Sequence, residues 1–223
     1  MESSSLALRI SMMAAVALTL VAIGIRVLND PRLLTLPGST TLIGGTVLLL
    51  LCYGVAMVRP SNDRNWPLRL HFATLLGAVA GFIQVIHLLV ERFSSFSGPR
   101  SGIITLAFML ATFLLWGFVG YRAREHGLSL GVSCLAAVWS AMVTMTIAVL
   151  AGTLLELYIA PIPLEEMRAW AEFQRSGWND LAAFSIANIL DEASTHLIVG
   201  PVVACLFGAL GYCFSRLMRR SVR

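Results

Sequence analysis

Long apolar runs constrain this chain more than any other feature, because about 20 apolar residues are what an α-helix needs to cross a bilayer. Six runs reach or approach that length, separated by shorter polar segments. They predict spans at about residues 6–28, 40–58, 68–91, 102–121, 129–157 and 183–216. We therefore expect an all-α fold, a polytopic transmembrane helical bundle of about six spans in one domain, residues 1–223.

The composition agrees with a membrane protein. Of the 223 residues, 57% are hydrophobic and 13% are charged, whereas soluble domains usually have about 25% charged residues. A β-barrel is not expected, because its short alternating segments are lacking. The first run, with Glu2 and Arg9 before or within it, is longer than the apolar region of a signal peptide, so it is expected to be an uncleaved span.

The longest polar segment separates the fifth and sixth runs. Its spacing predicts a short amphipathic helix at about residues 163–176, lying on the membrane surface. Pro163 suits the first turn of that helix, and Gly177 would end it. Asn179 or Asp180 would then cap the last span.

The arginines predict how the chain is threaded. Ten of the 16 fall on one side of the expected bundle. These are Arg9, Arg59, Arg64, Arg69, Arg122, Arg124, Arg216, Arg219, Arg220 and Arg223. By the positive-inside rule this side is cytoplasmic, which predicts a multi-pass inner-membrane protein with both termini inside. The basic residues form no cluster with interleaved aromatics, so no nucleic-acid partner is expected. The expected partners are the bilayer, partner membrane subunits or a second copy of the chain.

Small residues mark two expected helix contacts. Gly77 and Gly81 form a small-xxx-small pair in the third run, which lets another helix approach closely. In the fifth run a small, weakly polar face consists of Ser133, Ala137, Ser140, Thr144, Ala148 and Gly152. The cysteines match no CxxC or zinc pattern and are expected to be small core residues. They are Cys52, Cys134, Cys205 and Cys213.

The last run is the most unusual one. As a single helix over residues 183–216 it would be about 51 Å long, against a hydrocarbon core of about 30 Å. Its first half carries Asn188, Glu192 and His196 in an i, i+4, i+8 row, so neighbouring side chains can touch. Asp191 lies about 100° to one side of that row.

A proline follows one turn after this row. Within a helix, Pro201 frees the carbonyl four residues back, which is that of Leu197. The sequence therefore predicts a weak point in the backbone one turn from His196.

Ionisable side chains from three runs are expected to meet at one depth on the outer side. Gln84, His87 and Glu91 share a face in the last turns of the third run, and Glu156 ends the fifth. Alternating helix directions bring them level with the polar half of the last run. The candidate ligand or ion-binding residues are Gln84, His87, Glu91, Glu156, Asn188, Asp191, Glu192 and His196.

Several interpretations fit this cluster. Imidazole and carboxylate suit a divalent metal such as zinc or iron, with His87, Glu192 and His196 as ligands. A b-type haem between His87 and His196 needs two histidines at matching depth. The same carboxylates suit a proton or ion path, or a pocket for a lipid headgroup or small substrate. The structural alternative is that these residues are solvated helix ends, or satisfy one another at a helix contact.

Familiar catalytic motifs are missing from the sequence, which leaves open whether the chain is an enzyme. The first hypothesis is transport, or binding of an ion or small ligand, in an outward-facing His/carboxylate pocket. The second is a non-catalytic membrane subunit of a larger complex. The third is a metal- or haem-dependent membrane enzyme or electron carrier.

Overall fold

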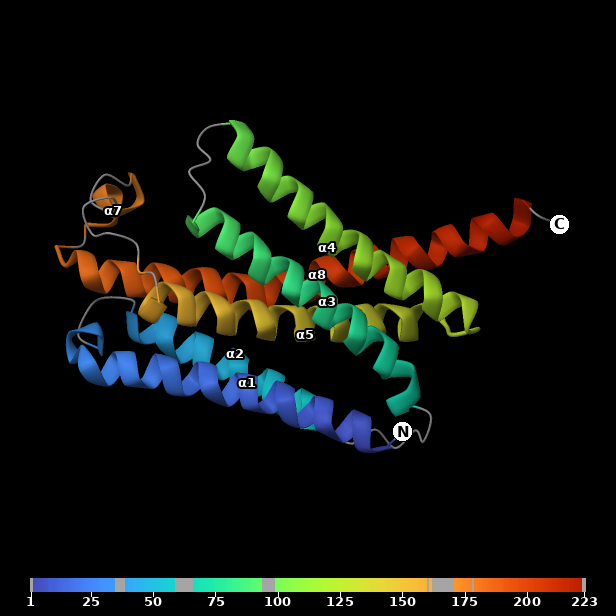
Figure 1. The fold of residues 1–223 in the computed structure, drawn as a ribbon, viewed down its shortest axis with the longest axis horizontal. Coiled ribbons are helices and arrows are strands. Elements are labelled where there is room, and N and C mark those ends of the chain that lie inside the picture. Colours follow the sequence, from blue (N-terminus) through green and yellow to red (C-terminus); the bar gives the residue numbers. More distant parts are fainter. Residues whose placement is uncertain are drawn as a thin grey trace.

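The structure is a bundle of long helices (Figure 1). The computed structural model describes residues 2–34, 39–58, 66–93, 99–159, 161, 171–177 and 179–221. Six helices are long and apolar enough to cross a membrane, which confirms the predicted polytopic bundle. They are α1 (Glu2–Asn29), α2 (Ser39–Val58), α3 (Trp66–Phe93), α4 (Pro99–Glu125), α5 (Leu130–Leu154) and α8 (Leu181–Ser221). The short elements are a 3₁₀ turn η1 (Pro31–Leu34), a π-helical turn η2 (Leu155–Ile159) and α7 (Ala171–Ser176).

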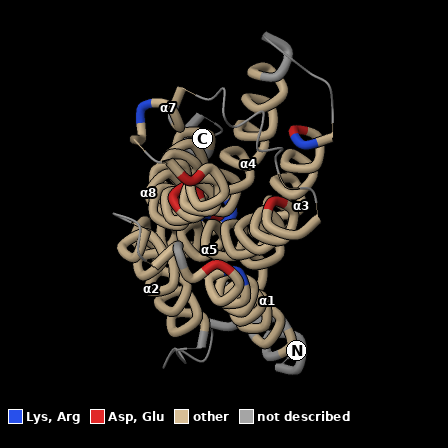
Figure 2. The backbone as a smooth tube through the Cα atoms, turned by 90° about the vertical axis from the view of Figure 1, so that its left-hand side faces the viewer, with Lys and Arg blue, Asp and Glu red and all other residues tan. Residues whose placement is uncertain are grey.

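Helix α5 is the centre of the bundle. It contacts α1, α3, α4 and α8, and Figure 2 shows the other helices grouped around it. Half of its apolar span is buried, against a third or less of each other span. The predicted small face explains this position, since Ser133, Ala137, Ser140 and Thr144 are fully buried. Small side chains let several helix backbones approach one helix closely.

The expected Gly77/Gly81 contact joins α3 to α5. A Cβ on Gly81 would lie 2.9 Å from two carbons of Ile147, and one on Gly77 would overlap the backbone of Ser140. The Thr144 hydroxyl donates across the same interface to the Gly77 carbonyl at 3.0 Å. Larger side chains at either glycine would therefore force the two backbones apart.

A second glycine contact, between α4 and α8, was missed from the sequence. A Cβ on Gly120 would overlap the backbone of Gly208, and one on Gly211 would overlap that of Gly117. Gly117 and Gly120 of α4 are three residues apart, as are Gly208 and Gly211 of α8, so the two glycines of each helix share one face. This spacing was the available signal.

The end of α4 differs from the sequence prediction. Residues 122–125 were expected in a loop but continue the helix. The reason is that Gly127 has the left-handed backbone conformation, with φ of 75°, and closes the helix. Its N–H donates to the Arg124 carbonyl, and the Leu128 N–H donates to the Ala123 carbonyl, which is the Schellman pattern.

The segment before α8 is described in part. Residues 162–170, which hold the first half of the predicted surface helix, lie outside the described residues. The second half is helical as Ala171–Ser176 and ends at Gly177, where φ is 71°. Asp180 caps α8 as expected, since its carboxylate accepts the Ala183 N–H at 3.1 Å.

Helix α8 stays continuous through its proline. It runs for 41 residues with Pro201 inside it. The Tyr53 hydroxyl of α2 donates at 2.6 Å to the carbonyl of Leu197, the group that Pro201 leaves without a helical donor. One side chain from another helix thus compensates for the predicted weak point.

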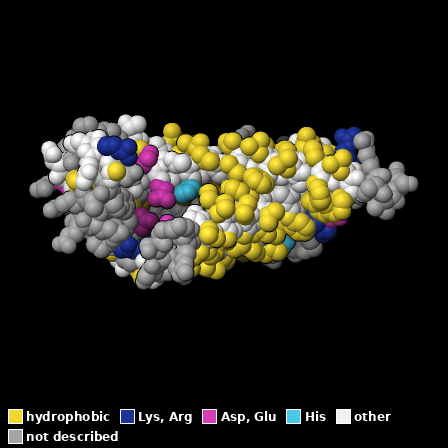
Figure 3. All heavy atoms as spheres, turned by 90° about the horizontal axis from the view of Figure 1, so that it is seen from above, with side chains coloured by type: hydrophobic (Ala, Val, Ile, Leu, Met, Phe, Trp, Pro, Cys, Tyr) yellow, Lys and Arg dark blue, Asp and Glu magenta, His cyan; other side chains and the backbone are white. Residues whose placement is uncertain are grey.

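Both termini lie at the same end of the bundle, and α7 lies at the other end (Figure 1). Large apolar side chains cover the surface between the two ends, as Figure 3 shows. Such a band is expected where lipid tails surround a multi-pass membrane protein.

Candidate functional site

A cavity of about 290 Å³ lies between α3, α4, α5 and α8. It reaches the end of the bundle away from the termini, where acidic and histidine side chains gather beside the apolar band (Figure 3). Its polar lining consists of Gln84, His87, Glu91, Thr105, Thr112, Thr153, Glu156, Glu192 and His196. Polar groups from four long helices and η2 therefore line one cavity.

The cavity brings together most of the candidate residues. Of the eight, six line it: Gln84, His87, Glu91, Glu156, Glu192 and His196. Asn188 and Asp191 do not. Asp191 is exposed, and its direction agrees with the 100° offset from Glu192 on the helical wheel. The structure therefore brings six of the eight candidates together in one cavity and leaves Asn188 and Asp191 outside its lining.

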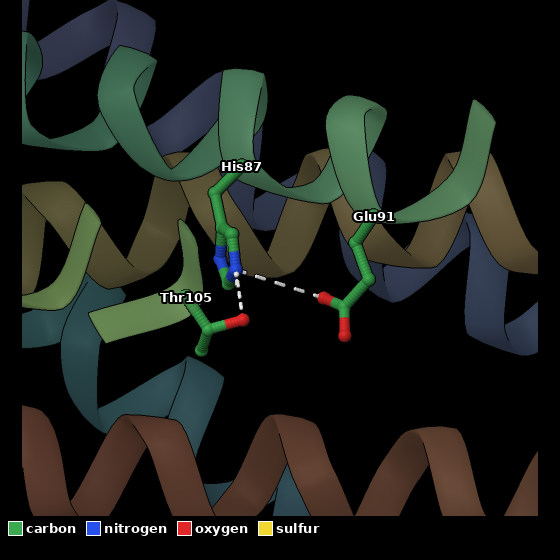
Figure 4. A network of polar contacts seen from close by, with 3 residues as sticks. All are labelled: His87, Glu91 and Thr105. Atoms are coloured by element: carbon green, nitrogen blue, oxygen red, sulfur yellow. Dashed lines mark hydrogen bonds and ion pairs between the residues drawn. The ribbon is translucent and has the colours of Figure 1, made fainter. Parts of the chain in front are cut away.

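His87 is the most firmly placed of these residues (Figure 4). It is only 9% exposed, and its Nε2 lies 3.2 Å from the Thr105 hydroxyl and 3.8 Å from a Glu91 carboxylate oxygen. The Phe108 ring packs against the imidazole with centroids 5.1 Å apart. The side chain therefore connects α3 to α4 and holds its ring at the cavity wall.

A second polar contact joins the same two helices deeper in the bundle. The Gln84 amide donates to the Thr112 hydroxyl at 2.7 Å. The two threonines of α4 that pair with α3 were not predicted as site residues. Thr105 and Thr112 are seven residues apart and so share one face of an otherwise apolar helix, which was the signal available.

The acidic end of the cavity is built from three elements. Glu91 ends α3, Glu192 lies in α8, and Glu156 lies in the π-helical turn that continues α5. The π turn widens the helix by one residue and changes the direction of its side chains, and such turns are frequent at functional sites. Glu91, Glu192 and Arg92 are charged neighbours of Glu156. Arg92 itself donates to the Pro161 carbonyl and does not line the cavity.

The opposite end of the cavity is apolar. Its lining there includes Phe113, Trp116, Met145 and Val203. Phe113 stacks on Phe207 at 4.9 Å, and the Trp116 indole N–H donates to Thr144 at 3.4 Å, so the floor is firmly packed. The cavity thus changes from charged to apolar along its length, which suits a molecule with one polar and one apolar part.

The geometry gives no support to the predicted metal centre. No group of three or more His, Cys, Asp or Glu side chains among the described residues is placed to hold one metal ion. His87, Glu192 and His196 line the same cavity without forming such a group. The haem between His87 and His196 stays a prediction that no observation here supports.

Comparison with known protein families, with characterised proteins and with solved structures gives no match for this chain. Its class follows from the fold alone. Six long apolar helices make it a multi-pass helical membrane protein.

Proposed function

We propose that this protein binds a small ligand in the cavity between α3, α4, α5 and α8 and moves that ligand across the membrane. The observation that supports this is that six of the predicted polar residues, from α3, α8 and η2, line one cavity. Ionisable side chains in the middle of a span cost about 2.5–3.5 kcal/mol each on insertion scales, and less near the ends of spans, where Glu91 and Glu156 lie. Their concentration around one cavity together with the buried His87 favours a binding role.

The alternative of solvated helix ends accounts for the cluster less well. Glu91, Glu192 and His196 are exposed, as solvated helix ends would be, whereas His87 is buried and contacts Thr105 of a second helix. Glu156 is half-buried in an irregular turn of α5. A subunit that only docks against other chains would not need polar groups inside its own bundle.

We further propose that the cavity end faces outward in an inner membrane and that both termini are cytoplasmic. The support is the ten-to-six division of the 16 arginines. The common location of the termini in Figure 1 is compatible with this threading.

Binding can be tested on purified protein in nanodiscs of neutral phosphatidylcholine. The probes are sodium, tetramethylammonium, benzyltrimethylammonium, phenylacetate and neopentylbenzene, which cover cations, an anion and a neutral molecule. At least one is expected to raise the thermal unfolding midpoint saturably, because a ligand at 100 times its Kd adds about 2.7 kcal/mol of stability. Uptake of that probe into proteoliposomes then tests transport.

A matched pair of variants locates the binding. Ala148 lines the cavity, so Ala148→Phe should fill it and abolish the shift. Ala107 is exposed on α4 and does not line the cavity, so Ala107→Phe should leave the shift intact. No shift with any of the probes, or equal shifts in both variants, would contradict the proposed function.

A further inference from the structure

The charged groups around the cavity favour one sign of charge on the ligand. Glu91, Glu156 and Glu192 bring three carboxyl groups to its polar end, and no arginine is among its described lining residues. The nearby Arg92 donates to the Pro161 carbonyl and adds one positive charge beside these three carboxyl groups. The two histidines of the lining add positive charge only when protonated. A cation is therefore favoured over an anion of the same shape.

The apolar end of the cavity favours a ligand with an apolar body. Phe113 and Trp116 present aromatic rings to the cavity, and Met145 and Val203 complete its floor. A small hydrated cation would leave this floor unused, whereas an apolar body would bury its surface there.

The side of the cavity opens between α4 and α8. Met109 and Val199 line it and are also 42% and 47% exposed. Both lie within the membrane-crossing segments, so their exposed surface faces lipid tails. The two helices touch at Gly120 and Gly208 and spread apart toward the α7 end (Figure 1). A molecule dissolved in the bilayer can therefore reach the cavity sideways.

We infer that the ligand is an amphipathic cation, an amine or quaternary ammonium on an apolar body, which enters from the bilayer between α4 and α8. This inference rests on the proposed function and adds the ligand class and the route. The cationic group lies among Glu91, Glu156 and Glu192, and the apolar body lies against Phe113 and Trp116.

Competition against radiolabelled benzyltrimethylammonium, in the same neutral nanodiscs, tests the ligand class. The labelled cation should bind saturably and at least about tenfold more tightly than tetramethylammonium, which lacks the apolar body. Phenylacetate reverses the charge, and neopentylbenzene replaces the nitrogen by carbon. Each should be weaker by at least about tenfold, because it leaves the carboxylates without a cationic partner.

Neighbouring acidic residues supply the matched variants. Glu192→Gln removes a charge that lines the cavity and should weaken benzyltrimethylammonium about tenfold. Asp191→Asn removes an exposed charge outside the lining and should change the affinity less than about twofold. Equal effects of the two variants would overturn the placement of the cation.

The outcomes separate this inference from the proposed function. Tighter binding of phenylacetate or neopentylbenzene overturns the cationic ligand but leaves a ligand-binding protein. If tetramethylammonium binds as tightly as benzyltrimethylammonium, the inferred apolar body is overturned but a ligand-binding protein remains. No binding by any of the probes overturns the proposed function and this inference with it.

The route is tested by association rates. Val199→Phe narrows the opening between α4 and α8 and should slow both association and dissociation of benzyltrimethylammonium by at least about fivefold. The control is Val202→Phe, since Val202 is also exposed on α8 but does not line the cavity. Stopped-flow tryptophan fluorescence measures both rates. An unchanged association rate for Val199→Phe overturns the lateral route.

Discussion

Replacing Tyr53 by Phe should destabilise the bundle through the carbonyl that its hydroxyl serves. Pro201 has no N–H, so Leu197 lacks the usual helical donor for its carbonyl. The Tyr53 hydroxyl donates to this carbonyl at 2.6 Å. Tyr53 is 6% exposed and Leu197 is 1% exposed, so solvent cannot replace the lost donor. The variant therefore leaves a buried backbone group without a partner.

The expected loss of unfolding free energy is near the upper end of the range for hydrogen bonds between membrane helices. Hydrogen bonds between membrane helices average about 0.6 kcal/mol and reach about 1.7 kcal/mol. A buried acceptor left unsatisfied costs about 1–3 kcal/mol. We expect Tyr53→Phe to lower the free energy of unfolding by about 1.5 kcal/mol.

Tyr158→Phe is the matched control. Its hydroxyl also donates to a carbonyl at 2.6 Å, that of Ala22 in α1. Ala22 lies in an uninterrupted part of that helix, so its carbonyl keeps its helical donor. The control should therefore cost only about 0.6 kcal/mol. Unfolding of both variants can be followed by circular dichroism in mixed micelles with increasing denaturing detergent.

A double-mutant cycle tests the explanation itself. Pro201→Ala restores an N–H that can donate to Leu197, so in that background Tyr53→Phe should cost only about 0.6 kcal/mol. The coupling between the two positions is then about 1 kcal/mol. The same cost for Tyr53→Phe in both backgrounds would refute the role assigned to the freed carbonyl. Equal costs for the two tyrosine variants would refute it as well.

Two further predictions concern packing and threading. Gly81→Leu should destabilise the bundle by about 1–3 kcal/mol, because a Cβ at this position would already lie 2.9 Å from Ile147. Leu75→Ala should destabilise it less, because Leu75 is 57% exposed. Equal folded yields in detergent would show that Gly81 is not a close contact. For threading, an impermeant thiol reagent on intact cells should label Glu172→Cys and not Ser221→Cys, in a background without the native cysteines. The reverse pattern would place the cavity end on the cytoplasmic side.

The six spans could be predicted from the sequence because the bilayer imposes one simple requirement. Each crossing needs about 20 apolar residues in a helix that satisfies its own backbone. The second run was expected at about 40–58 and forms Ser39–Val58. The end of α4 was placed too early because Arg122 and Arg124 suggested a polar loop, whereas Gly127 decides where that helix stops.

The polar part of the candidate site was also accessible from the sequence. Ionisable residues are rare in apolar runs, so His87, Glu156 and Glu192 were visible, and alternating helix directions gave their common depth. Thr105 and Thr112 were not visible in the same way. A threonine in a span can satisfy its hydroxyl on its own helix, as Thr146 does on Met142, so its presence does not indicate a partner helix.

Which helices lie side by side was decided by the tertiary structure. Lipid tails are as apolar as leucine, so hydrophobicity does not distinguish a face that meets lipid from one that meets another helix. The sequence by itself determined six apolar helices, the weak point at Pro201 and the polar residues at one depth. The tertiary structure determined that α4 crosses α8 at their glycines, that Tyr53 reaches Leu197, and that four helices enclose a cavity. These contacts depend on shape and on single hydrogen bonds, and neither is encoded in a pattern of apolar residues.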